Sequence, residues 1–179
     1  MIYFFTSIIL LLIVLYQFIN RLSKLVVYPK TKPSEQSYKT EVLDRDLDAF
    51  LNSVTMESYI VKSTLGYDLN SAFIRNGNSK KCMVLCHGIT ANLNCSIKYA
   101  KLFYDKGFSI FMYDHRNHGL SGGDFTSMGY FEKIDLKTCV DWVYSTLGED
   151  IKLGVFGESM GAATVLQYCA IDDRVDFCI

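Results

Sequence analysis

The hydrophobic pattern divides the chain into one uninterrupted apolar run at its N-terminus and, further on, an alternation of strand-like and helix-like segments. The run extends from Ile2 to Ile19 without a charged residue, close to the roughly 20 residues that cross a bilayer as a helix. It lacks the polar face of a helix that packs on a protein surface. No basic residue precedes it and no small-residue cleavage pattern follows. We therefore predict an uncleaved transmembrane anchor over residues 1–20, in preference to a signal peptide or a buried core helix.

Residues 21–37 are predicted to form a juxtamembrane linker, because Pro29 and Pro33 disfavour a helix and the polar residues around them disfavour a core. The basic residues of this region all follow the apolar run: Arg21, Lys24, Lys30 and Lys32. The positive-inside rule places that side of the membrane in the cytoplasm. We expect a single-pass N-terminal anchor and favour a cytoplasmic domain, with the opposite orientation left open.

The remaining residues, 38–179, are predicted to form one globular domain. Helical spacing from Tyr38 to Asn52 is followed by a strand pair, 57–62 and 68–75. Apolar strands then alternate with helices, with strands at 81–86, 108–113, 151–156 and 175–179, and helices at 94–106, 130–147 and 160–171. This order predicts an α/β fold whose mostly parallel sheet has helices on both faces. Sheets of this kind build their sites at the carboxyl ends of the strands.

Composition narrows the function classes. The formal net charge is -1 and no run of Lys and Arg is present, which disfavours nucleic-acid binding. Neither the histidines nor the cysteines have metal-ligand or disulfide spacing, so we predict no metal and no cofactor, and no protein partner is indicated. Cys86 lies beside His87, but it shares the parity of Cys82 and Val84, which predicts a buried strand face instead of a nucleophile.

The most informative motif is Gly157-Glu158-Ser159-Met160-Gly161, a G-x-S-x-G between an apolar strand and a helix. This context predicts a sharp turn that projects the hydroxyl of Ser159 above the sheet, which makes Ser159 the candidate nucleophile. Glycine is needed at Gly157 and Gly161 because side chains there would collide with the neighbouring elements. The following helix N-terminus also leaves backbone N–H groups free beside the serine.

A second block, Leu85-Cys86-His87-Gly88-Ile89-Thr90, leaves the end of the strand at 81–86. A turn at His87 and Gly88 can bring another backbone N–H toward the serine. We therefore predict that the amides of Met160 and Ile89 form an oxyanion hole, a pair of donors that stabilises negative charge on a substrate oxygen.

A third block, Asp114-His115-Arg116-Asn117-His118-Gly119-Leu120-Ser121, follows the strand at 108–113. With these three blocks in this order, the sequence over roughly residues 55–179 resembles the α/β-hydrolase superfamily, in particular bacterial serine aminopeptidase-like and monoacylglycerol-lipase-like hydrolases. The resemblance implies an α/β-hydrolase fold and cleavage of an ester, thioester or amide bond in a small-molecule acyl substrate. It also implies a histidine base that activates the serine and a carboxylate that orients the histidine.

The acid and base of that triad are not apparent in this chain. In the family both follow the serine, yet no histidine follows Ser159. The resemblance implies structural roles for His87 and His118, and His115 is expected to be exposed. The acids that follow Ser159 are expected to be solvated or to cap elements: Asp172, Asp173 and Asp176.

We therefore expect a sequence that is incomplete at its C-terminal side, with residues 175–179 forming an uncovered edge strand. Two other interpretations stay open. One is a catalytically inactive, membrane-tethered binding module or a non-functional fragment. The other is an acyltransferase or thioesterase, which would use the same constellation of residues.

Overall fold

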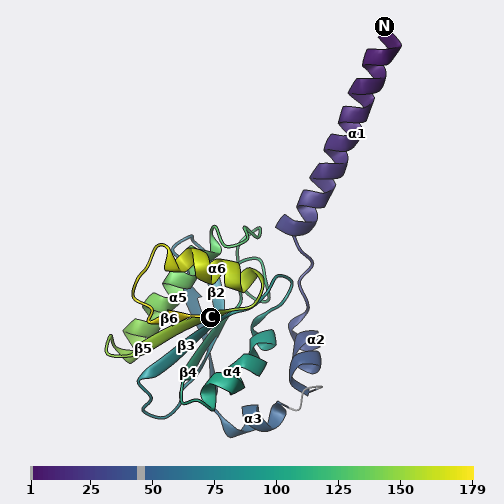
Figure 1. The fold of residues 1–179 in the computed structure, drawn as a ribbon. Helices are drawn as coiled ribbons and strands as arrows, with labels where there is room; N and C mark the ends of the chain where they lie inside the picture. Colours follow the sequence, from purple (N-terminus) through teal and green to yellow (C-terminus); the bar gives the residue numbers. More distant parts are fainter. Residues whose placement is uncertain (1, 44–46) are drawn as a thin grey trace.

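A long N-terminal helix projects away from a compact α/β domain in the computed structural model, which describes residues 2–43 and 47–179 (Figure 1). Helix α1 spans Ile2–Val27. The stretch Tyr3–Val27 is long and apolar enough to cross a membrane, and none of its apolar window is buried against the rest of the described chain. The helix therefore continues past the predicted anchor into the segment that we expected to be a linker.

The segment that follows α1 is structured and packs against the domain. Its helices are short: α2 (Ser34–Tyr38), the π-helix η1 (Lys39–Leu43) and α3 (Asp48–Ser53). The predicted helix over residues 38–52 is thus divided among these elements, with residues 44–46 outside the described part. Val42 and Phe50 are buried against the sheet. Burial of these two apolar side chains attaches the region to the domain, whereas a flexible linker would not be attached.

Six strands form one mixed sheet in the order β1-β2-β4-β3-β5-β6. The strands are β1 (Met56–Lys62), β2 (Asp68–Ile74), β3 (Lys81–Cys86), β4 (Ser109–Tyr113), β5 (Lys152–Gly157) and β6 (Phe177–Cys178). The hairpin β1–β2 is antiparallel, and β2 also runs antiparallel to β4. The other neighbours, β4–β3, β3–β5 and β5–β6, are parallel. The predicted α/β class and mostly parallel sheet are confirmed.

Helices cover both faces of the sheet (Figure 1). One face packs against α4 (Ile97–Tyr104), which follows the 3₁₀ turn η2 (Leu93–Ser96). The other face packs against α5 (Glu132–Leu147) and α6 (Met160–Cys169).

The side chains of β3 illustrate why its sequence is apolar without interruption from Cys82 to Cys86. Cys82, Val84 and Cys86 point toward the α5 and α6 side, whereas Met83 and Leu85 point toward the α4 side. A central parallel strand is buried on both faces, so these five positions are apolar. Burial also raises the pKa of the Cys86 thiol to about 12, which keeps it protonated and unreactive. The predicted structural role of Cys86 fits this environment.

Candidate active site

Ser159 lies in a strained turn between β5 and α6. Its φ of 55° falls in the left-handed region, which costs a residue with a Cβ atom about 1 to 3 kcal/mol. The two flanking glycines leave no room for a side chain. A Cβ atom on Gly157 would lie 2.3 Å from the carbonyl carbon of Gly161, and one on Gly161 would lie 2.1 Å from the carbonyl oxygen of Cys86. The turn therefore depends on close backbone packing, and Ser159 is exposed at its apex.

The loop that follows β3 passes beside this serine. A Cβ atom on Gly88 would make ordinary contact with Ser159 Cβ, at 3.5 Å, and the Glu158 N–H donates to the carbonyl of Cys86 (3.0 Å). Within the described residues, the backbone N–H groups of Ile89 and Met160 donate no hydrogen bond. Both amides are thus free to bind a substrate oxygen, which is the property that an oxyanion hole requires.

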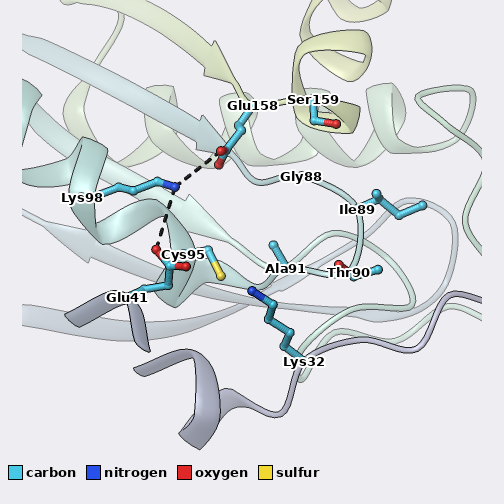
Figure 2. A pocket seen from close by; sticks show the side chains of 10 residues that line it. All are labelled: Lys32, Glu41, Gly88, Ile89, Thr90, Ala91, Cys95, Lys98, Glu158 and Ser159. Atoms are coloured by element: carbon cyan, nitrogen blue, oxygen red, sulfur yellow. Dashed lines mark hydrogen bonds and ion pairs between the residues drawn. The ribbon is translucent and has the colours of Figure 1, made fainter. Parts of the chain in front are cut away.

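A pocket of about 190 Å³ opens at this point (Figure 2). Its walls come from the β3 loop, the β5 turn, α4, η1 and the segment after α1. The lining residues are Lys32, Glu41, Gly88, Ile89, Thr90, Ala91, Cys95, Lys98, Glu158 and Ser159. The structure therefore brings Ser159, Gly88 and Ile89 together around one cavity.

Two buried histidines hold the β3 loop against the loop that follows β4. The Nδ1 atom of His87 lies 2.8 Å from the Gly88 carbonyl, and its Nε2 accepts the N–H of His115 at 3.0 Å. His118 repeats this arrangement, with Nδ1 at 2.8 Å from the Arg116 carbonyl and Nε2 accepting the N–H of Thr90 at 3.1 Å. A backbone N–H can only donate, so each Nε2 is unprotonated and each Nδ1–H donates to a carbonyl.

Both histidines are therefore neutral structural groups. Burial lowers the pKa of His87 to about 3 and also lowers the pKa of His118, because a charged imidazolium is costly without water. Every ring nitrogen of His87 and His118 already has a partner. The structural role that the resemblance implied for these two residues agrees with this geometry.

His115 differs from the prediction, because it is completely buried instead of exposed. Its ring packs edge-on against the rings of His87 and Tyr113, at centroid distances of 4.6 and 5.0 Å. The connection after β4 folds back under the β3 loop, which the local sequence does not reveal. Neither ring nitrogen of His115 has a hydrogen-bond partner among the described residues, and burial lowers its pKa well below the usual value.

Asp114 organises the start of the same connection. Its carboxylate accepts hydrogen bonds from the Asn70 side chain (2.8 Å) and from the backbone N–H groups of Leu93 (2.7 Å) and Leu120 (2.9 Å). Burial raises the pKa of the carboxyl group, against these hydrogen bonds. A Cβ atom on Gly119 would lie 2.1 Å from this carboxylate, which explains the glycine. Asp114 thus has a structural role, because its carboxylate binds these three donors and not Ser159.

Two charged side chains in the pocket, Glu41 and Lys98, carry no signal in the sequence. Lys98 on α4 lies 3.4 Å from the carboxylate of Glu158 and 3.9 Å from that of Glu41 (Figure 2). No motif contains Glu41 or Lys98, and the two lie far apart in the chain. Only the packing of η1 against α4 brings them to the site.

Of the acids that follow Ser159, Asp172 and Asp176 are engaged in other interactions. The carboxylate of Asp172 pairs with the guanidinium of Arg174 at 2.5 Å. The hydrogen bonds that Arg174 donates lower the pKa of Asp172 to about 2. Asp176 accepts the N–H of Leu153 at 2.8 Å. Asp173 is exposed. Among the described residues, no group of three His, Cys, Asp or Glu side chains could hold a metal ion.

The covered parallel sheet and the serine turn at the end of β5 define an α/β hydrolase. The family model described as "Serine aminopeptidase, S33" matches residues 77–178. The chain belongs to this family.

Relatives and solved structures agree with that assignment. YqkD of Bacillus subtilis, described as uncharacterized, is 36% identical over 161 residues, which cover 88% of this chain and 52% of YqkD. The esterase Pf2001 of Pyrococcus furiosus superposes with a TM-score of 0.66 at 26% identity, over 70% of this chain and 50% of the esterase. The lid-less serine hydrolase XC6422 of Xanthomonas campestris shares the fold, with a TM-score of 0.56 at 20% identity over 64% of this chain and 56% of that protein. The chain thus spans about half the length of YqkD and Pf2001.

Proposed function

We propose that this chain supplies the nucleophile and the oxyanion hole of a membrane-anchored serine hydrolase that cleaves an ester-type bond. The observation that carries the proposal is the turn at Ser159, where a φ of 55° is maintained between two glycines that admit no side chain. Backbone strain of this kind is retained where it serves a function.

In the proposed reaction, the Ser159 hydroxyl attacks the carbonyl carbon of the substrate. The carbonyl oxygen becomes an oxyanion, which the N–H groups of Ile89 and Met160 stabilise. The alcohol, thiol or amine then leaves with a proton, and water hydrolyses the acyl-enzyme. The similarity to the Pyrococcus furiosus esterase supports an acyl ester as the substrate.

Serine requires a base that accepts its proton. The rings of His87 and His118 are held by hydrogen bonds on both nitrogens, and His115 is buried beneath them. We infer that none of these histidines is the base. The catalytic base is therefore proposed to be a group outside these 179 residues.

A fluorophosphonate probe tests the nucleophile, because it reacts with activated serines. In the full-length protein that contains this sequence, we expect labelling that disappears in Ser159→Ala. Ser145→Ala is the matched control, since Ser145 is exposed on α5 and its hydroxyl donates to the Trp142 carbonyl (2.7 Å) of its own helix. That variant is expected to label like the unmodified protein.

Two results would contradict the proposal. One is a full-length protein that is folded by circular dichroism but is not labelled. The other is labelling that persists in Ser159→Ala, which would place the reactive serine elsewhere.

A further inference from the structure

The segment between α1 and η1 is bonded to the loop that carries the proposed oxyanion donor. The Lys32 N–H donates to the Thr90 carbonyl at 2.8 Å. The buried side chain of Asn92 donates to the Lys32 carbonyl at 3.1 Å, and that of Asn94 donates to the Ser34 hydroxyl at 3.0 Å. The end of α1 is therefore coupled to the pocket by a short, ordered segment.

A second connection joins the same helix end to the β4–α5 connection. The buried Thr126 N–H donates to the carbonyl of Val27, the last residue of α1, at 2.8 Å. Both attachment points follow carboxyl ends of strands, because Thr90 follows β3 and Thr126 follows β4. Helix α1 thus leaves the domain at the carboxyl ends of the strands (Figure 1). Ser159 and its pocket lie at the same end of the sheet.

The β4–α5 connection presents large apolar side chains to solvent at this edge. Leu120 is 74% exposed, Tyr130 is 62% exposed and Met128 is 44% exposed. Asp124 is the only acidic residue between Leu120 and Tyr130. Exposed apolar groups beside an apolar helix that can span a membrane form a surface suited to the bilayer boundary.

Charge and aromatic character at the end of α1 fit the same boundary. Arg21 and Lys24 lie in the last turns of the helix, and Lys30 follows it. Basic residues next to a spanning segment attract anionic headgroups. Tyr28, which is 56% exposed, and Tyr130 are residues of the type enriched at headgroup level.

We propose that the carboxyl edge of the sheet rests on the membrane surface, so that the pocket beside Ser159 takes its acyl ester from a lipid of the bilayer. This inference rests on the proposed hydrolase function and on insertion of α1. The loop carrying Leu120, Met128 and Tyr130 enters the headgroup region. The segment around Lys32, which is bonded to Thr90, holds the pocket at the level of the lipid headgroups.

Depth-dependent quenching of tryptophan fluorescence tests the orientation without requiring catalysis. The full-length protein is reconstituted in vesicles of phosphatidylcholine and phosphatidylglycerol whose acyl chains carry bromine, a contact quencher. Tyr130→Trp is expected to lose roughly half of the emission of its added tryptophan, as a residue at the headgroup–acyl boundary should. The native Trp142 is subtracted with the unmodified protein.

Two further variants serve as controls. Leu12→Trp lies in the middle of α1 and reports whether the helix inserts. Lys80→Trp is exposed and precedes β3 at the opposite edge of the sheet, so it should not be quenched. Quenching at positions 12 and 130 but not at position 80 supports the proposal.

The proposal is overturned if position 130 is quenched no more than position 80 while position 12 is strongly quenched. It is also overturned if position 12 is not quenched, because the helix then does not insert. Each variant is made in a Ser159→Ala background as well. Quenching there is independent of turnover, so loss of the hydrolase proposal and loss of the orientation can be told apart.

Discussion

The two halves of the site are held in different ways. The turn after β5 is held by steric contact, because the backbones of β3, β5 and α6 approach so closely at Gly157 and Gly161 that no Cβ atom fits. The loop after β3 is held by hydrogen bonds with remote residues: its Thr90 N–H donates to His118, and the Lys32 N–H donates to the Thr90 carbonyl. Close backbone packing thus holds the nucleophile turn in place, whereas hydrogen bonds with residues distant in the sequence hold the oxyanion loop.

The largest expected difference in stability between the two loops comes from replacing a glycine in each of them by alanine. Gly161→Ala is expected to destabilise the domain by about 3 kcal/mol or more, because its Cβ atom meets backbone that cannot move aside. Gly88→Ala should change stability much less, since its Cβ atom would find only contacts at 3.4 and 3.5 Å. Urea unfolding followed by circular dichroism measures both. Equal losses in the two variants would contradict the distinction.

A fall in pH is expected to weaken the support of the loop after β3, because buried histidines hold that loop. His87 is neutral in the folded domain, because burial lowers its pKa to about 3 from the ordinary value of 6.5. The unfolded chain binds a proton more readily, so stability is present above pH 6.5 and is lost as the pH falls toward 3. One such histidine contributes a slope of up to about 1.4 kcal/mol per pH unit in this window.

The free energy of unfolding, measured between about pH 8 and pH 4, tests this pH dependence. His115→Leu provides a comparison, because the pKa of His115 is also lowered by burial. The variant should have a shallower slope by about one proton. A flat profile in the unmodified protein would show that the histidines titrate normally.

A pair of histidine variants compares a bonded ring with an unbonded one. His118→Leu removes the acceptor of the Thr90 N–H and the donor to the Arg116 carbonyl, at an expected cost of about 2 kcal/mol. His115→Leu breaks no hydrogen bond among the described residues and should stay within about 1 kcal/mol of the unmodified protein. Thermal unfolding compares them, and a larger loss at position 115 would reverse this interpretation.

The smallest expected effect is a gain in stability at the nucleophile. Ser159→Gly should stabilise the domain by about 1 kcal/mol, because glycine adopts the φ of 55° without strain. Ser159→Ala keeps the Cβ atom and should not gain. Denaturant midpoints of the two variants give the answer, and equal midpoints would mean that the turn stores no strain.

Most of the fold was predictable because its signals are local. Short, mostly apolar runs predicted strands β3, β4 and β5, which lie in the buried middle of the sheet. Helices α5 and α6 were placed by the apolar positions that follow β4 and β5. The steric demand at Gly157 comes from residues close in sequence, whereas Gly161 meets the backbone of Cys86 on β3. The turn was nevertheless predictable, because the G-x-S-x-G motif between a strand and a helix identifies it.

The predictions that differed from the structure concern contacts between distant segments. His115 was expected to be exposed but is buried, because its connection folds under the β3 loop. Residues 21–37 were expected to form a linker, yet α1 extends to Val27 and Asn92 binds the segment that follows. Neither contact has a periodic or motif signal, since each depends on where another loop lies.

The amino-acid sequence by itself determined the apolar N-terminal helix, the order of strands and helices, and the strained serine turn. The helix and the order of elements follow from hydrophobic periodicity over a few residues, and the turn follows from the glycines that its motif supplies. Only the tertiary structure decided the wall of the pocket, where Glu41, Lys98 and Lys32 meet Ser159. It also decided which sheet edge α1 leaves from. Those features depend on chain segments that become neighbours only when the sheet and its helices have packed.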